Sequence, residues 1–243
     1  MTAIDASEVP GQLLRARLTE LLKGVHPWDE QERTHLAAAM EWVASGAPLY
    51  RTRKPDVPSM HLVSYFVVLD ETCGELLLVA HRKAGLWLPS GGHVEPLEDP
   101  WDTVTRECRE ELRIEAVPST VSGAQPLFLT VTQTRGQGQH TDVSLWYVLQ
   151  SKVGGITSFD EEEFEAIKWL SLRQILAEPG NRLDPHMHRF SQAHERHRLR
   201  VGILAAKSTQ FSLVSSPYRF GSNRTLVSCV AWRSLRRAVI TSC

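Results

Sequence analysis

The sequence has little cysteine, and its cysteines are not paired. Its 243 residues include four cysteines, and no two of them form a CxxC motif. Four scattered cysteines in a chain of this length favour reduced thiols over the disulfide framework of a small secreted domain.

Long apolar runs are also missing. No run approaches the roughly 20 apolar residues that span a bilayer. The opening residues, MTAIDASEVPGQ, carry neither a basic nor an apolar stretch, so no secretory signal is predicted. Hydrophobic residues make up 42% and charged residues 23%, as in globular proteins. We expect a cytoplasmic protein with no membrane partner.

Acidic residues are absent after Glu195, where nine Arg and Lys follow. Because the whole chain has a net charge of −1, residues 1–195 carry −10. The His-rich stretch 184–197 precedes this tail and lacks the cysteine partners of a zinc site. We expect a basic, loosely ordered tail; contact with nucleic acid is the less favoured interpretation.

The first fifty residues have a helical pattern. Leu14, Leu18 and Leu21 recur at helical spacing, and Asp29 with Glu32 forms a capping-box pattern ahead of a second apolar series. The segment RTRKPDVPS (51–59), with two prolines, reads as a linker.

From residue 60 onward the pattern is typical of strands. The apolar and β-branched runs are residues 61–70, 75–83, 126–134, 142–150 and 165–170. The first four form two hairpins, and helices are expected at 100–112 and 171–178. Antiparallel pairs around a helix favour a mixed α/β sheet over a doubly wound one.

The predicted helix 100–112 places three carboxylates on one face. Glu107, Glu110 and Glu111 stand at i, i+3 and i+4, beside an apolar stripe that includes Val104 and Cys108. A solvated helix with salt bridges is the ordinary interpretation of such a pattern. Like charges at i, i+4 are unfavourable, however, and a hard cation such as Mg²⁺ would remove that cost.

Two glycines precede the helix, and the whole segment resembles the Nudix box. The pattern is Gly92, five residues, Glu98, seven residues, then RECREELRI from 106 to 114. Six such residues at set offsets arise by chance on the order of 10⁻⁷ per starting position. The resemblance implies a Nudix-type mixed β-sheet in an α/β/α sandwich at residues 58–180, with a helical segment at 1–57 and the tail at 181–243.

The box departs from the Nudix pattern twice. Arg113 stands where the family has a glycine, which closes the helix in a left-handed conformation. Either a longer helix or a strained cap is expected there. Cys108 replaces an aliphatic residue, a mild change because a buried thiol packs as a small hydrophobe.

The resemblance implies hydrolysis of a nucleoside diphosphate linked to another moiety, with Mg²⁺, or Mn²⁺ in its place. Glu107 and Glu111 would be the main metal ligands, with Glu110 beside them and the Gly91 carbonyl completing the set. Arg106 would orient Glu107 through a charge-assisted hydrogen bond. Glu98 would stabilise the junction between loop and helix or act through water.

The general base is expected in the acidic segment FDEEEFEAIKWL, which offers Glu161, Glu162, Glu163 and Glu165. Glu163 is the favoured candidate, although a solvated acidic loop is the more common outcome for any one of them. Glu107 or Glu111 could also serve.

Substrate contacts are expected outside the carboxylates. Gly92 would let a phosphate approach the backbone, and Arg82 would meet a terminal phosphate beside Trp87. The candidates for base recognition are Tyr65, Phe66, Trp87, His140 and Trp146, although strand aromatics are more often core residues.

Three functions fit the box to different degrees. A hydrolase of nucleoside triphosphates, oxidised ones included, is the default. Relatives that act on ADP-ribose or on dinucleoside polyphosphates carry a characteristic Pro or Tyr past the box. This chain has Leu129–Val131 at that place, so neither of these substrates is favoured. A non-catalytic nucleotide-binding module is the main alternative, although such modules typically lose carboxylates that this chain keeps. An isopentenyl diphosphate isomerase would need a catalytic cysteine in the sheet, and Cys73 is predicted in a turn.

Overall fold

The computed structural model describes residues 8–54, 56–134 and 139–214. It divides the chain into two compact units, Met1–Arg198 and Leu199–Cys243. Of the tail predicted at 181–243, the segment Met187–Val214 forms a helix rather than a loosely ordered segment. Residues 215–243 lie outside the described residues, so their order stays a prediction. The division at residues 57 and 180 likewise stays a proposal.

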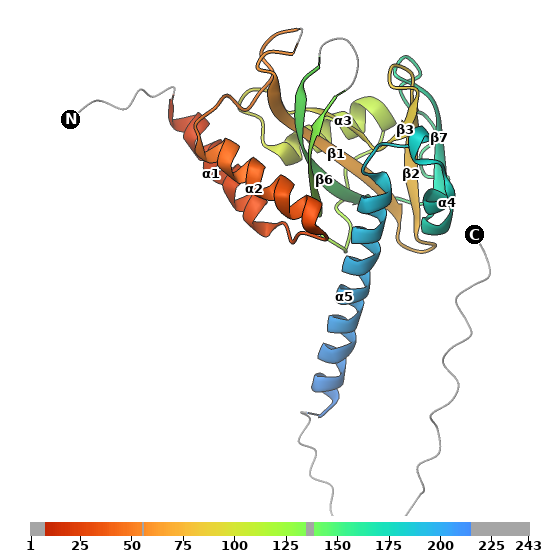
Figure 1. Cartoon of the computed structure of the whole chain (residues 1–243). Coiled ribbons are helices and arrows are strands. Elements are labelled where there is room, and N and C mark those ends of the chain that lie inside the picture. The colour runs from red at the N-terminus through yellow and green to blue at the C-terminus, as the bar shows by residue number, and fades with distance from the viewer. Residues whose placement is uncertain (1–7, 55, 135–138, 215–243) are drawn as a thin grey trace, which may run out of the picture. The chain divides into compact units, whose positions relative to one another are not determined.

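Two helices open the described chain, α1 (Glu8–Gly24) and α2 (Glu30–Ala44). Both were predicted, and Figure 1 shows them side by side. Asp29 caps α2, since its side chain accepts a hydrogen bond from the Glu32 backbone N–H at 2.8 Å. The buried residues Leu18, Leu21 and Leu22 place α1 in the same hydrophobic core as the sheet.

The sheet has seven strands and is mixed, as predicted. They are β1 (Met60–Asp70), β2 (Glu75–His81), β3 (Leu86–Leu88), β4 (Ser90–His93), β5 (Phe128–Gln133), β6 (Thr141–Gln150) and β7 (Phe164–Ser171). The order is β3-β2-β1-β6-β5, with β4 beside β1 and β7 beside β2. Only β1 and β6 pair in parallel among these strands.

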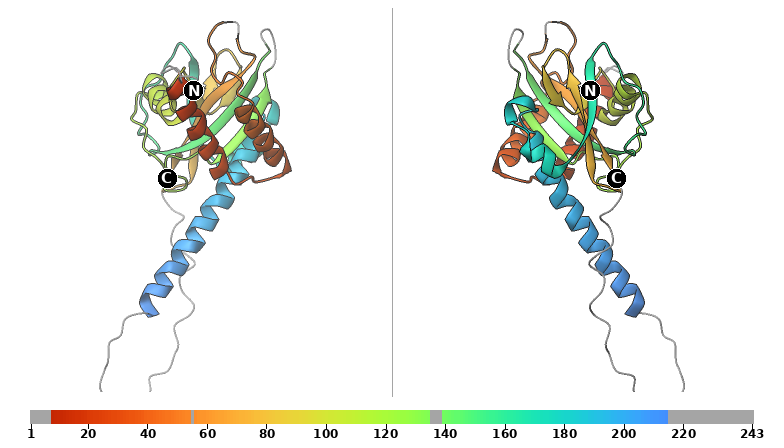
Figure 2. Two further views of the ribbon diagram at one scale, coloured as in Figure 1. Left: turned by 90° about the vertical axis from the view of Figure 1, so that its left-hand side faces the viewer. Right: turned by 90° about the vertical axis from the view of Figure 1, so that its right-hand side faces the viewer.

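Alternate residues of β1 face two different cores. Leu62, Phe66 and Val68 pack with α1, α2 and α3 (Pro100–Leu112), whereas Val67 and Leu69 pack with the other group of helices. That second group is α4 (Leu172–Ala177) and the first turns of α5 (Met187–Val214). Figure 2 shows helices on both faces of the sheet. The predicted α/β/α sandwich is therefore confirmed.

Helix α3 ends at Leu112, followed by a strained cap. Arg113 has φ 56° and ψ 30°, the left-handed conformation that the family's glycine adopts without strain. Of the two alternatives left open by the sequence, the structure has the strained cap. A left-handed non-glycine residue costs roughly 1–2 kcal/mol.

Three elements were not predicted from the sequence: β3, β4 and α5. Strands β3 and β4 have three and four residues, too few for a periodic pattern, and a 3-10 turn at Gly180–Arg182 precedes α5. Helix α5 is seated by the buried Met187 and Phe190. None of the helices that the structure describes is long and apolar enough to cross a membrane.

Candidate active site

Helix α3 holds its carboxylates in place through its N-terminus and its apolar stripe. The Asp99 side chain accepts from the Trp101 backbone N–H at 2.9 Å, and Pro100 occupies the first turn, where a missing N–H costs nothing. Val104 and Cys108 are fully buried against the sheet. Beside this stripe, Glu107 and Glu111 of α3 lie against β4, next to Gly92 and Gly91 respectively.

Glu107 and Glu111 line a cleft of about 300 Å³. It is bounded by β1, β4, α3, the start of β6 and the segment before β7. Three carboxylates predicted from the sequence, Glu107, Glu111 and Glu163, lie on its wall. Other lining residues include Arg51, Tyr65, His81, His93 and Asp142.

Glu111 is the most buried of these carboxylates, with 4% of its surface exposed. Its Oε2 accepts the Gly91 backbone N–H at 3.0 Å. Burial, followed by the charges of Glu107 and Glu163, raises the pKa of Glu111 well above its usual range. The contact shown for Gly91 is thus through its N–H; the predicted ligand role of its carbonyl stays a prediction.

Glu107 lies beside Gly92 and Arg106. Arg106 Nη1 donates to Glu107 Oε1 at 2.8 Å, while burial raises the pKa of Glu107 above its usual value. A Cβ built on Gly92 would overlap the Glu107 carboxylate. Glycine is therefore required here to make room for the carboxylate, a constraint additional to the phosphate approach predicted for it.

Arg106 also joins Glu98 to the helix. Its Nε and Nη2 donate to the two Glu98 oxygens at 3.0 and 3.1 Å. Glu98 Oε2 further accepts from Thr103 Oγ1 at 2.7 Å and from the Glu95 N–H at 3.0 Å. Glu98 thus stabilises the junction between loop and helix, and Glu110 lies at the exposed edge, 3.4 Å from Arg106 Nη1.

Of the four candidate bases Glu161, Glu162, Glu163 and Glu165, only Glu163 is among the residues lining the described cleft. Its Oε1 lies 3.3 Å from His81 Nε2. Arg82 holds the same segment, since its Nε donates to the Glu161 carbonyl and its backbone N–H to the Glu163 carbonyl, both at 2.9 Å. Arg82 is not a lining residue of the cleft, and its predicted phosphate contact stays a prediction.

The candidate aromatic residues are divided between cleft and core. Tyr65 lines the cleft. Phe66 and Trp146 are fully buried, so their predicted contact with a base is wrong. Trp87 lies in β3, outside the cleft lining, with Lys168 Nζ 4.4 Å from its ring centroid. Its predicted substrate contact stays a prediction.

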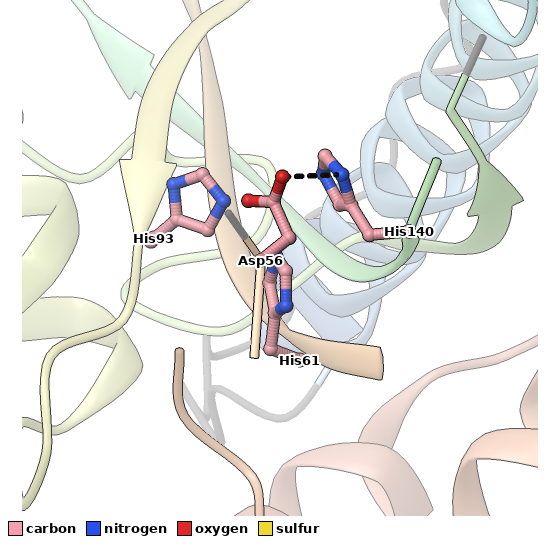
Figure 3. A group of neighbouring side chains, drawn as sticks. All are labelled: Asp56, His61, His93 and His140. Atoms are coloured by element: carbon pink, nitrogen blue, oxygen red, sulfur yellow. Dashed lines mark ion pairs between the residues drawn. The ribbon is translucent and has the colours of Figure 1, made fainter. Parts of the chain in front are cut away.

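His140 lies in a cluster that was missed in the sequence. It faces Asp56, His61 and His93, and Figure 3 shows the four side chains converging. The sequence held two local signals, the histidine directly after Gly91-Gly92 and the His-x-Asp pattern at 140–142. Neither signal indicated that the segments meet, because that follows from the parallel pairing of β1 with β6 and the antiparallel pairing of β1 with β4.

The carboxylates fit a hard divalent cation. The donors that Glu107, Glu110 and Glu111 offer are all oxygens, which Mg²⁺ and Mn²⁺ prefer over nitrogen or sulfur. Burial is the main cause that raises the pKa of both Glu107 and Glu111, and neighbouring carboxylates add to it: Glu110 and Glu163 at Glu107, and Glu107 and Glu163 at Glu111. A divalent cation between them would favour the ionised forms of both.

Comparison with known proteins defines the class. The profile of the NUDIX domain family matches residues 60–190, more than half of the chain. The chain therefore belongs to the Nudix family, whose members are pyrophosphohydrolases that generally use a divalent metal. This confirms the resemblance carried by Gly92 and the box glutamates.

Individual relatives are more distant. The chain is 27% identical to the CTP pyrophosphohydrolase of Escherichia coli K12 over 124 residues, which are 49% of this chain and 84% of that protein. Among solved structures, the MutT protein from Methanosarcina mazei Go1 is 22% identical, covers 57% of this chain and 95% of its own, and has a TM-score of 0.46. The E. coli ORF135 protein is 26% identical, with coverages of 57% and 91% and a TM-score of 0.42.

Proposed function

We propose that this chain is a Mg²⁺-dependent pyrophosphohydrolase that cleaves a phosphoanhydride bond of a nucleoside triphosphate. The observation that carries the proposal is the pair of the half-buried Glu107 and the buried Glu111, which line one cleft and have raised pKa values. Perturbed carboxylates gathered in a cleft are typical of functional sites.

In this proposal the α3 carboxylates hold the cation. Glu107 and Glu111 are the main ligands, Glu110 lies beside them, and the Gly91 carbonyl is a further candidate. When bound, Mg²⁺ or Mn²⁺ neutralises phosphate charge and polarises the bond to be broken. Arg106 positions Glu107 through the 2.8 Å hydrogen bond, and Glu98 fixes Arg106 from the other side.

Glu163 is proposed to accept the proton of the attacking water. It faces the cleft from the segment before β7, opposite α3, and His81 Nε2 lies 3.3 Å from its carboxylate. Its charge contributes to the raised pKa of both Glu107 and Glu111, which supports a role beside them. Glu107 and Glu111 are the alternative bases.

The substrate class rests on the cleft and on the relatives. A cavity of about 300 Å³ is at the small end of the size usual for ligand sites. CTP is the first nucleotide to test, because the E. coli relative is named for its hydrolysis. Oxidised nucleoside triphosphates are the next to test, because the predicted substrate class includes them.

The test is a substrate panel assayed for phosphate and pyrophosphate release with Mg²⁺. It includes CTP, the other standard and oxidised nucleoside triphosphates, ADP-ribose, sugar nucleotides and dinucleoside polyphosphates. We expect turnover of one or a few triphosphates and none in Glu111→Gln. No turnover across the panel, with a nucleotide still raising the Tm, would contradict the hydrolase and favour a nucleotide-binding module.

A further inference from the structure

Four metal-binding side chains from four separate segments meet at one end of the cleft. Asp56 comes from the linker before β1, His61 from β1, His93 from the end of β4 and His140 from the segment just before β6. One ligand-type atom from each lies within 4.8 Å of the others. Figure 3 shows Asp56 between the three imidazoles.

We propose that Asp56, His61, His93 and His140 bind one divalent transition-metal ion, with Zn²⁺ as the representative, at a site separate from the α3 carboxylates. Three imidazoles and one carboxylate are a typical ligand set for Zn²⁺ and its neighbours. Mg²⁺ prefers oxygen ligands and keeps several waters, so this cluster discriminates against it. The two sites therefore differ in the metals that they favour.

The first argument is the orientation of the buried ring of His61. Its Nδ1 lies 3.0 Å from the Pro58 carbonyl, which can only accept, so Nδ1 carries the proton. In the neutral ring Nε2 then presents a lone pair toward Asp142 Oδ1 at 3.3 Å. Neither of these two buried atoms has a hydrogen-bond partner in the described part of the chain.

Two facing acceptors repel each other unless a cation or a proton lies nearby. His61 stacks on His140, whose ring centroid is 4.8 Å away at an interplanar angle of 23°. His140 Nδ1 lies 3.3 Å from Asp56 Oδ2, so that both rings and this carboxylate border the same small space. A metal ion in that space would accept the lone pair of His61.

The second argument is His93. Its Nε2 is buried and has no hydrogen-bond partner among the described residues, although its ring centroid lies 4.8 Å from that of His61. A buried polar atom without a partner costs about 1–3 kcal/mol. Coordination to a shared ion would give this nitrogen a partner.

Neighbouring groups fix the rings as they do around known metal sites. The Pro58 carbonyl lies 3.0 Å from His61 Nδ1, and Asp142 Oδ1 lies 3.2 Å from His140 Nε2, in each ring at the nitrogen that is not assigned to the ion. Asp142 is not one of the four ligands. Carbonyls and carboxylates behind metal-binding histidines are the usual outer support of such sites.

The four ligand atoms must move only slightly closer together to bind one Zn²⁺ ion. Tetrahedral Zn²⁺ with bonds of about 2.0–2.1 Å places its ligand atoms about 3.3 Å apart. His140 Nδ1 and Asp56 Oδ2 already stand at 3.3 Å. The widest pair must therefore approach by about 1.5 Å, which side-chain rotation of the half-buried Asp56 and His93 can supply. The bound ion would tie the linker to β1, β4 and β6 at the rim of the cleft.

The test uses the full chain stripped with a chelator, in a Glu107→Gln/Glu111→Gln background that removes the main carboxylate ligands of α3. Isothermal titration with Zn²⁺ should show one equivalent bound, and excess Mg²⁺ should not compete. His93→Gln should weaken Zn²⁺ binding by at least about 100-fold, since even outer-shell changes cost 10–100-fold. The matched control His26→Gln, at an exposed histidine outside the cluster, should bind as the parent does.

Two further measurements keep the result decisive. If circular dichroism shows that His93→Gln fails to fold, Asp56→Asn in the linker replaces it and should lose at least about 10-fold in affinity. Co²⁺ should give the intense visible absorption of a four-coordinate site, lost in the same variants. Equal Zn²⁺ affinity in parent and folded cluster variants, or no tight equivalent in the parent, would overturn the proposal. Neither outcome depends on hydrolysis, so the proposed function is judged separately.

Discussion

At the scale of single residues, the site depends on how closely the backbone of β4 approaches the carboxylates of α3. Glu111 receives the Gly91 N–H, and the Glu107 carboxylate occupies the space where a side chain on Gly92 would begin. Each glycine therefore acts on a particular carboxylate. An added methyl group at Gly92 meets the Glu107 side chain and should disturb catalysis more than stability, whereas at Gly91 it would meet the backbone of Ser64.

Gly92→Ala tests this directly. The added methyl must displace the Glu107 carboxylate, and a shift of about 1 Å in a catalytic group costs on the order of 100-fold in rate. We expect kcat to fall by at least about 10-fold with unchanged circular dichroism. Gly24→Ala, where no atom lies within 4 Å of the added Cβ, should keep the parent rate. Equal rates in the two variants would show that the glycine has no role in placing Glu107.

The Nudix box made the carboxylates predictable, since all its acidic residues lie within one loop and one helix. The contacts of Arg106 with Glu98 and Glu107 follow from that local spacing. The Asp56–His61–His93–His140 cluster was not predictable, because its members lie on four segments that only the pairing of β1 with β4 and β6 brings together. Local sequence patterns do not indicate which distant segments will pair.

At the scale of elements, the strained end of α3 is the clearest departure from the family pattern. Arg113→Gly should relieve the left-handed strain and raise the free energy of unfolding by up to about 1 kcal/mol, the remainder being offset by the greater freedom of glycine in the unfolded chain. Chemical denaturation measures the difference. Arg113→Ala, which keeps the strain and loses the side chain, should not be stabilised. An equal gain in both would assign the effect to the arginine side chain.

The docking of α2 on β5 depends on a buried acid. Glu32 accepts the backbone N–H of Trp28 at 2.6 Å and that of Leu129 at 3.1 Å. Burial raises its pKa from 4.5 to about 7. The folded protein therefore keeps this proton where the unfolded chain releases it, so the stability due to the neutral acid is present below pH 4.5 and lost as pH rises through about 7.

Glu32→Gln should remove this dependence, because the amide stays neutral and its oxygen can still accept. Relative to the parent, the variant should gain about 1–3 kcal/mol in free energy of unfolding between pH 5 and pH 8. Urea titrations at the two pH values give the comparison. Glu30→Gln, at an exposed position in the same turn, should show no such gain. A pH-independent difference for Glu32→Gln would contradict the buried-acid account.

Short elements explain most of what the sequence did not predict at this scale. Strands β3 and β4 are too short to show alternation, and their pairing with β2 and β1 is what makes them strands. Helices α1 to α4 and both hairpins were predictable because each has a full period of its pattern, whereas the long helix α5 was not predicted. At Arg113 the sequence predicted an irregular helix end. The structure shows that α3 ends in a strained cap there and does not continue as a longer helix.

At the scale of the whole molecule, the N-terminal helices are part of the main core. Leu22 of α1 is fully buried in the cluster that also contains Val104 and Cys108 of α3. Leu22→Ala should lower the free energy of unfolding by about 2–5 kcal/mol. Leu13→Ala, on the same helix with 66% of its surface exposed, should change it by less than about 0.5 kcal/mol. Equal small effects would indicate that α1 is an appendage rather than core.

The central claim is that the carboxylates of α3 make hydrolysis depend on Mg²⁺. The measurement is the initial rate for the best triphosphate of the panel as Mg²⁺ is titrated into chelator-treated parent, Glu111→Gln and the exposed control Glu115→Gln. The account predicts no rate without metal, a saturable rise in the parent and in Glu115→Gln, and a rate at least about 100-fold lower in Glu111→Gln. Mg²⁺-dependent turnover retained in Glu111→Gln, with unchanged circular dichroism, would contradict it.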